Sequence, residues 1–169
     1  MADAPAKTEL EQIAAIFARH GVEYLIIGGQ AEVLHGSPRI TYDIDFCYRR
    51  RRENFPRLAA ALQELQCTLR GAPKDLPFIL DARTIEMGNN FTFDTPLIDL
   101  DLLGYVEPIG TYEELRPNAV HYPSHGIDLW AISVEDLLRI KRHINRLKDQ
   151  ESIYQLLAIQ RIRSERSNT

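Results

Sequence analysis

Two aspartates lie two residues apart in the alternating segment from Arg39 to Tyr48. Apolar or aromatic residues occupy every second position of this segment, and polar residues, among them Asp43 and Asp45, occupy the positions between. Such alternation is typical of a β-strand, which points both carboxylates the same way, roughly 6.6 Å apart along the strand. Like charges this close repel each other, and a divalent cation is the usual reason to retain them. The pair is therefore a candidate metal site.

A second acidic pair, Asp99 and Asp101, alternates with apolar residues between Leu97 and Leu103. If this predicted strand lies beside the first, opposed side chains are about 5 Å apart and three or four carboxylates converge. Such a cluster can hold the two ions, about 3.5 to 4 Å apart, that nucleotidyl and phosphoryl transfer use. Oxygen ligands suit Mg²⁺, and Mn²⁺ is equally compatible with the sequence. The pattern does not choose between Asp99 and Asp101 as the third ligand.

Residues that could meet a phosphate lie just before the first acidic strand. The apolar run 22–27 ends at Gly28 and Gly29, and glycine allows a backbone to approach a phosphate closely and expose its amides at the start of a helix. Arg39 is equally suited to neutralising the carboxylates and to contacting a phosphate. Thr41 is either a simple strand former or a substrate contact.

The elements that must position these residues alternate between helix and strand periodicity. Helices are predicted from Thr8, which forms a capping box with Glu11, across 55–65, from the cap Ser133, and from the cap Asp149. Strands are predicted at 22–27, 39–48, 90–94 and 97–103, with a hairpin over 119–132 that turns at 124–126. Residues 68–88 are left unassigned. The order predicts one α+β domain over 1–169, a mixed sheet flanked by helices, with its core at about 8–157 and C-terminal helices at about 134–163.

The composition narrows the class of protein. A chain of 169 residues with a formal charge of −4 is the size of one domain and is not a dedicated DNA-coating protein. The basic run 49–52 is either a solvated face or a guide for nucleic acid. Neither a membrane-spanning stretch nor a signal peptide is recognised, so we expect a cytoplasmic protein without membrane association. The two cysteines fit reduced, structural thiols.

The run Gly-Gly-Gln-Ala-Glu-Val-Leu-His-Gly at 28–36, followed by Arg39, Thr41 and Asp43-Ile-Asp45, resembles the signature of the nucleotidyltransferase superfamily, whose founding fold is that of DNA polymerase beta. The likeness is greatest to the small bacterial AbiEii-type nucleotidyltransferase toxins and their uncharacterised relatives. The segments 95–104 and 133–149 resemble the strand with the third metal carboxylate and the C-terminal lysine-then-aspartate helix of that family. The likeness runs in order from about residue 8 to residue 157.

The resemblance implies a set of roles. Asp43 and Asp45 would be the catalytic metal-binding pair, with Asp101 as the third ligand and Asp99 in reserve. Gly28 and Gly29 would meet the triphosphate, and Lys141 would reach the nucleotide or the acceptor. The implied activity is transfer of a nucleoside monophosphate from a triphosphate such as ATP to a hydroxyl of RNA, protein or a small molecule, with two Mg²⁺ or Mn²⁺ ions. A toxin role with an antitoxin partner is also implied.

Two other interpretations stay open. Many superfamily members have serine after the glycines where this chain has Gln30, which favours a catalytically degenerate fold retained as a nucleotide-binding or regulatory module. A metal-dependent glycosyltransferase also uses Asp-x-Asp with a nucleotide diphosphate. The motif lies so close to the N-terminus that no nucleotide-binding half precedes it, and this disfavours the glycosyltransferase.

Overall fold

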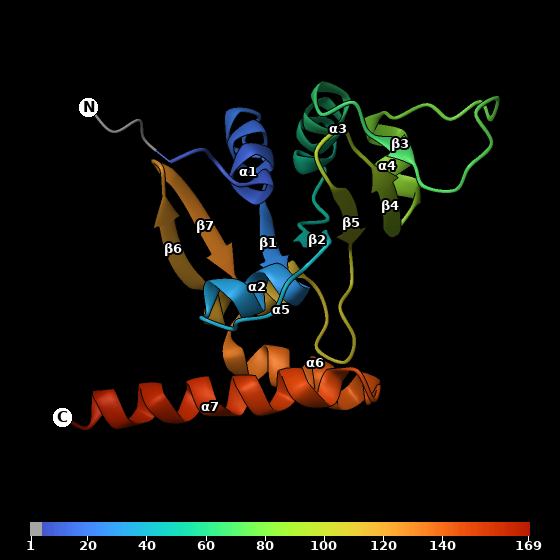
Figure 1. Cartoon of the computed structure of the whole chain (residues 1–169). Coiled ribbons are helices and arrows are strands. Elements are labelled where there is room, and N and C mark those ends of the chain that lie inside the picture. Colours follow the sequence, from blue (N-terminus) through green and yellow to red (C-terminus); the bar gives the residue numbers. More distant parts are fainter. Residues whose placement is uncertain (1–4) are drawn as a thin grey trace.

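A computed structural model describes residues 5–169 as one mixed sheet with helices around it (Figure 1). The sheet has seven strands in the order β3-β4-β5-β2-β1-β7-β6. The strands are β1 (Tyr24–Ile27), β2 (Asp43–Tyr48), β3 (Thr68–Leu69), β4 (Asn90–Asp94), β5 (Asp99–Leu103), β6 (Val120–Ser124) and β7 (Ile127–Ala131). The helices are α1 (Glu9–Arg19), α2 (Gly28–Leu34), α3 (Asn54–Glu64), α4 (Ala82–Met87), α5 (Tyr112–Leu115), the 3₁₀ turn η1 (Arg116–Asn118), α6 (Val134–Ile144) and α7 (Asp149–Ser167). The predicted α+β class is confirmed.

The apolar face of β2 anchors the centre of the sheet. Ile44, Phe46 and Tyr48 are fully buried, and the ring of Phe46 packs edge-on against Phe17 of α1 with centroids 5.3 Å apart. Helices α1 and α3 lie side by side next to this core (Figure 1). Burying aromatic rings in such contacts stabilises the fold and holds β2 rigidly. The carboxylates on the opposite side of the strand therefore have a fixed base.

The first acidic strand is shorter than the alternation predicts. β2 begins at Asp43, and the alternating residues Ile40 and Tyr42 are 74% and 82% exposed. The reason is the extent of the neighbouring strands, because β5 pairs with β2 only from Asp43 onward and β1 only from Asp45 onward. Without a neighbouring strand to pair with, residues 39–42 approach the sheet as an irregular segment. The prediction of a strand from residue 39 is wrong for these four residues.

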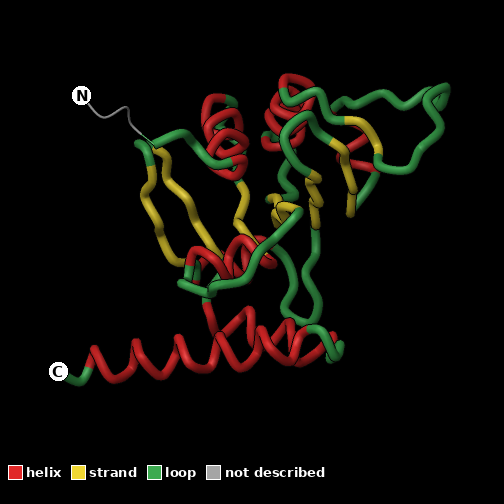
Figure 2. The backbone as a smooth tube through the Cα atoms, in the orientation of Figure 1, coloured by secondary structure: helices red, strands yellow, loops and turns green. Residues whose placement is uncertain are grey.

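The remaining predicted elements are mostly confirmed. Thr8 and Glu11 form the capping box of α1, and the Ser133 hydroxyl accepts a hydrogen bond from the Asp136 amide at the start of α6. The hairpin β6–β7 turns at the predicted place. Asp149, however, does not cap the last helix, because it is the first residue of α7 and its carboxylate binds Lys141 and Arg146 instead. The unassigned stretch 68–88 contains β3, α4 and the long loop between them, which extends from the sheet in Figure 2.

The C-terminal helices pack on each other at the end of the sheet (Figure 1). α7 is 19 residues long, and its buried residues, Asp149, Ser152, Ile153 and Leu156, all lie in its first half. α6 and the start of α7 thus form a separate layer beside the acidic strands.

Among residues 5–169, no helix is both long and apolar enough to cross a membrane.

Candidate metal and nucleotide site

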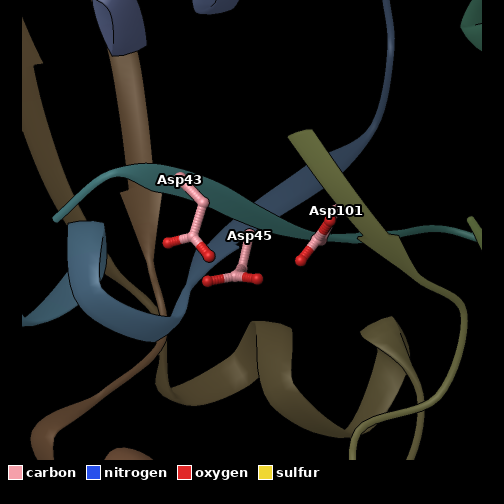
Figure 3. Close-up of side chains that lie close together, drawn as sticks. All are labelled: Asp43, Asp45 and Asp101. Atoms are coloured by element: carbon pink, nitrogen blue, oxygen red, sulfur yellow. The ribbon is translucent and has the colours of Figure 1, made fainter. Parts of the chain in front are cut away.

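Parallel pairing of β2 with β5 brings the two acidic strands together. Asp43 lies opposite Asp99, and Asp45 lies opposite Asp101. One carboxylate oxygen from each of Asp43, Asp45 and Asp101 lies within 4.8 Å of the other two. Figure 3 shows the three side chains leaving their strands toward the same space. Asp99 lies outside this group and is exposed, so the structure gathers three of the four predicted carboxylates.

The electrostatics of the cluster disfavour three unscreened negative charges. The pKa of Asp45 is raised to about 7, chiefly by burial and in addition by the negative charges of Asp43 and Asp101. Burial also raises the pKa of Asp101, although the Arg70 guanidinium partly opposes this. A divalent cation would relieve the repulsion, and an all-carboxylate donor set suits Mg²⁺ or Mn²⁺. The residues present therefore fit the predicted metal.

The glycine turn between β1 and α2 lies directly against this cluster. Gly28 has a left-handed backbone with φ of 61°, and a side chain there would collide with Oδ2 of Asp45. A Cβ on Gly29 would lie 2.5 Å from Cγ2 of Thr41. Only glycine satisfies both the backbone conformation and the close approach at position 28. The turn therefore borders the carboxylate cluster so closely that a side chain at position 28 has no room.

The polar groups predicted to contact the nucleotide are held by other protein groups. Arg39 Nη1 lies 2.7 Å from Glu32 Oε2, and Lys141 Nζ lies 2.9 Å from Glu32 Oε1 and 3.0 Å from Asp149 Oδ1. The Thr41 hydroxyl accepts a hydrogen bond from Gln30, at 2.7 Å. Glu32 is completely buried. Arg39, Thr41 and Lys141 surround the glycine turn, and their contact with a nucleotide stays a prediction.

A cavity of about 380 Å³ lies next to the carboxylates. Gly28, Asp45 and Lys141 line one part of it, and most of the remaining wall is apolar, formed by Ile27, Leu103, Tyr105, Val106, Leu137, Ile140 and Ile144. This volume is in the range of small-molecule sites. A larger cavity of about 540 Å³ lies beside β3 and the following loop, and none of the three clustered carboxylates lines it. Because Asp45 of the carboxylate cluster lines the smaller cavity, that cavity is the candidate substrate site.

Two charged residues at the site were not singled out by the sequence pattern. Glu32 is a buried carboxylate in the helix that begins at the glycines, and a charge among Ala31, Val33 and Leu34 was the available signal. Arg70 follows β3, in the stretch left unassigned, and no pattern there pointed to the carboxylates. The basic run at 49–52 is partly structural, because Arg49 forms ion pairs with Glu23 and Glu113.

Solved nucleotidyltransferases share this fold. The lincosamide antibiotic adenylyltransferase LnuA, solved with lincomycin bound, has a TM-score of 0.60 at 17% identity over 89% of this chain and 96% of that chain. ANT(2'')-Ia in complex with adenylyl-2''-tobramycin has a TM-score of 0.58 at 15% identity over 94% and 95%. A Thermotoga maritima protein provisionally assigned as a nucleotidyltransferase has a TM-score of 0.55 at 15% identity over 88% and 90%. No protein-family model and no curated protein matches the sequence. The predicted nucleotidyltransferase fold is confirmed, and the closer likeness to AbiEii-type toxins stays a prediction.

Proposed function

We propose that this protein is a metal-dependent nucleotidyltransferase, which transfers a nucleoside monophosphate from a nucleoside triphosphate to a hydroxyl group. One observation carries the proposal. Asp43, Asp45 and Asp101 bring three carboxylate oxygens within 4.8 Å of one another, beside a glycine turn. LnuA, a structural neighbour that is named as an adenylyltransferase, supports the same reaction class.

The residues divide the work in the proposed reaction. Asp43, Asp45 and Asp101 would hold two Mg²⁺ or Mn²⁺ ions, and Asp99 is the alternative to Asp101 as the third ligand. When bound, such ions activate an attacking hydroxyl and stabilise the negative charge of the departing pyrophosphate. The acceptor hydroxyl loses its proton to solvent as its oxygen forms a bond to the α-phosphorus, and the bond between that phosphorus and the pyrophosphate oxygen breaks. Gly28 and Gly29 would leave room for the triphosphate.

Lys141 and the cavity wall would serve the rest of the nucleotide. Lys141 is 7% exposed and lines the cavity together with Asp45 and Gly28, and its ion pairs with Glu32 and Asp149 would hold its positive charge beside the region where phosphates would lie. Arg39 and Thr41 would act from the other side of the glycine turn. The largely apolar remainder of the cavity suits a nucleoside, ATP being one substrate to test.

A small hydroxylated molecule is the acceptor class that we propose first. LnuA was solved with lincomycin and ANT(2'')-Ia with adenylyl-2''-tobramycin, so proteins with this fold accommodate such molecules. RNA and protein hydroxyls remain the other acceptor classes to test.

Labelled substrates test the enzyme directly. The full chain is incubated with each α-labelled triphosphate, Mg²⁺ or Mn²⁺, and panels of hydroxylated small molecules, RNA and protein. We expect transfer of label by the wild type and none by Asp43→Ala/Asp45→Ala. Equal behaviour of the two proteins with every acceptor would contradict the proposal.

A toxin role, with an antitoxin as partner, is the finer function that the sequence resemblance suggests. Expression of the wild type in the bacterial cytoplasm should then arrest growth, and Asp45→Ala should relieve the arrest because it removes a central carboxylate. A wild type that leaves growth unchanged would contradict this role without affecting the proposed reaction.

A catalytically inactive nucleotide-binding module is the second candidate. Gln30 favours it, because its amide donates to Thr41 at the position where many superfamily members have a serine. Calorimetry, which measures triphosphate binding, and the labelled-transfer assay together separate the two functions. Triphosphate binding without transfer to any acceptor would favour the module, and transfer of label would exclude it.

A further inference from the structure

Arg70 joins the carboxylates from the β3 side of the sheet. Its Nη2 lies 3.0 Å from Asp101 Oδ1, and the same nitrogen donates to the Phe93 carbonyl at 3.0 Å. Its Nε donates to Asp94 Oδ1 at 3.3 Å and lies 3.6 Å from Asp99 Oδ2. Within residues 5–169, Arg70 is the only cationic residue paired with Asp101. One planar guanidinium thus spans two strands and reaches the carboxylate cluster of Asp43, Asp45 and Asp101, the proposed metal cluster.

We propose that Arg70 is a positioning residue, which orients Asp101 so that the carboxylate joins Asp43 and Asp45 around the metal. The inference rests on the proposed metal-dependent function and deepens it. Asp101 is the one member of the cluster that comes from β5, whereas the other two share β2. Its rotamer must therefore be set separately, and a contact to one carboxylate oxygen does this. Groups that bind a metal ligand from behind commonly fix the orientation of that ligand.

The anchoring of Arg70 favours orientation over simple charge balance. Phe93 and Asp94 belong to β4 and take no part in the metal cluster, yet both accept hydrogen bonds from the guanidinium. They hold the planar group in place whether or not a cation is bound. A lysine at this position would carry the same charge but could not span these acceptors with a rigid fork.

The two effects of Arg70 on metal binding have opposite signs, which makes the inference testable. A positive charge 3.0 Å from a metal ligand repels a cation, so charge alone predicts tighter binding when Arg70 is removed. Orientation predicts weaker binding, because Asp101 loses the contact that holds its rotamer. The direction of the change therefore decides between them.

The measurement is the affinity of the full chain for Mn²⁺ in the absence of nucleotide, determined by calorimetry and by electron paramagnetic resonance. We expect Arg70→Ala to weaken Mn²⁺ binding about tenfold or more. Arg70→Lys should also weaken it, by a smaller factor. Arg83→Ala is the matched control, since Arg83 is an exposed arginine on the neighbouring helix α4. The Mn²⁺ affinity of this variant should equal that of the wild type.

A double-variant cycle tests whether Arg70 acts through Asp101. In the Asp101→Asn background, Arg70→Ala should change the Mn²⁺ affinity by less than about twofold, because the two effects are not additive when one residue acts through the other. Melting temperatures in chelator identify variants that lose the fold, and Arg70→Gln replaces Arg70→Ala if the latter unfolds. Unchanged or tighter Mn²⁺ binding by a folded Arg70 variant would overturn the inference alone. A wild type that binds no Mn²⁺ would overturn the proposed function together with it.

Discussion

At the scale of single residues, Asp45 shows most directly how the site depends on a cation. Its carboxyl is largely buried between Asp43 and Asp101, and these surroundings raise its pKa from 3.8 to about 7. The folded protein therefore holds a proton on Asp45 at pH values where the unfolded chain has released it. Deprotonation of the metal-free fold consequently costs free energy, and a bound cation would remove that cost.

The contribution of Asp45 to the free energy of unfolding of the metal-free protein should therefore fall as the pH rises from about 4 to about 7. A raised carboxyl pKa means that the native state binds more protons than the unfolded state between these two pH values. The stabilisation is therefore complete below about pH 4 and is lost as the pH rises to about 7. The difference between 3.8 and about 7 corresponds to a loss on the order of 4 kcal/mol. Urea denaturation in chelator, between pH 4 and pH 8, measures it.

Asp45→Asn supplies the control for this pH dependence. Asparagine keeps the shape of the side chain but cannot ionise, so the variant should be more stable than the wild type at pH 8 and should show a flatter profile. A wild type whose stability rises between pH 4 and pH 7 by as much as that of the variant would show that Asp45 does not titrate as proposed. Adding Mg²⁺ should stabilise the wild type at pH 8 more than the variant.

The two aspartates of β5 provide a matched pair for locating the third ligand. Asp101 has an oxygen within 4.8 Å of Asp43 and Asp45, whereas Asp99 lies outside the cluster. Asp101→Asn should weaken Mn²⁺ binding by at least about tenfold, and Asp99→Asn by far less. Calorimetric titration of the two variants measures the difference. A larger loss in Asp99→Asn would reverse the assignment.

At the scale of secondary-structure elements, the β1–α2 turn should tolerate no side chain at Gly28. Gly28→Ala would place a methyl group against Oδ2 of Asp45 and force alanine into a left-handed conformation that costs roughly 1 to 2 kcal/mol. We expect loss of stability together with weaker Mn²⁺ binding. Gly126→Ala separates the two causes, because Gly126 also has positive φ, at 76°, but has open space around its Cβ. If both variants retain Mn²⁺ affinity, the turn does not shape the metal site.

The sequence predicted the elements whose own residues encode their pairing partners. The alternation around Asp43 and Asp45 and the acidic pair at Asp99 and Asp101 predicted two strands whose carboxylates would converge if the strands were neighbours, and the register does pair them residue for residue. The pattern failed where pairing depends on a neighbour's length, as at residues 39–42. The contacts of Arg70 also lay beyond reach, because they depend on a short edge strand and a loop without periodicity.

At the scale of the whole molecule, a buried charge network links the sheet to the C-terminal helices. Glu32 of α2 binds Arg39, which precedes β2, and Lys141 of α6, while Lys141 also binds Asp149 at the start of α7. Asp149 binds Arg146 as well. These contacts connect four segments around the glycine turn. The wall of the cavity formed by α6 is thus held in place relative to the metal cluster by charge as well as by apolar packing.

Glu32→Gln should accordingly destabilise the entire domain. The substitution leaves Lys141 buried with one carboxylate and Arg39 without its ion-pair partner, and breaking a buried network of this kind costs about 3 to 5 kcal/mol. Glu165→Gln is the matched control, because its ion pair with Arg161 on α7 is exposed and contributes no more than about 1 kcal/mol. Urea denaturation at pH 7 compares both variants with the wild type. A loss in Glu32→Gln no greater than that in Glu165→Gln would mean that apolar packing alone holds α6 and α7 against the sheet.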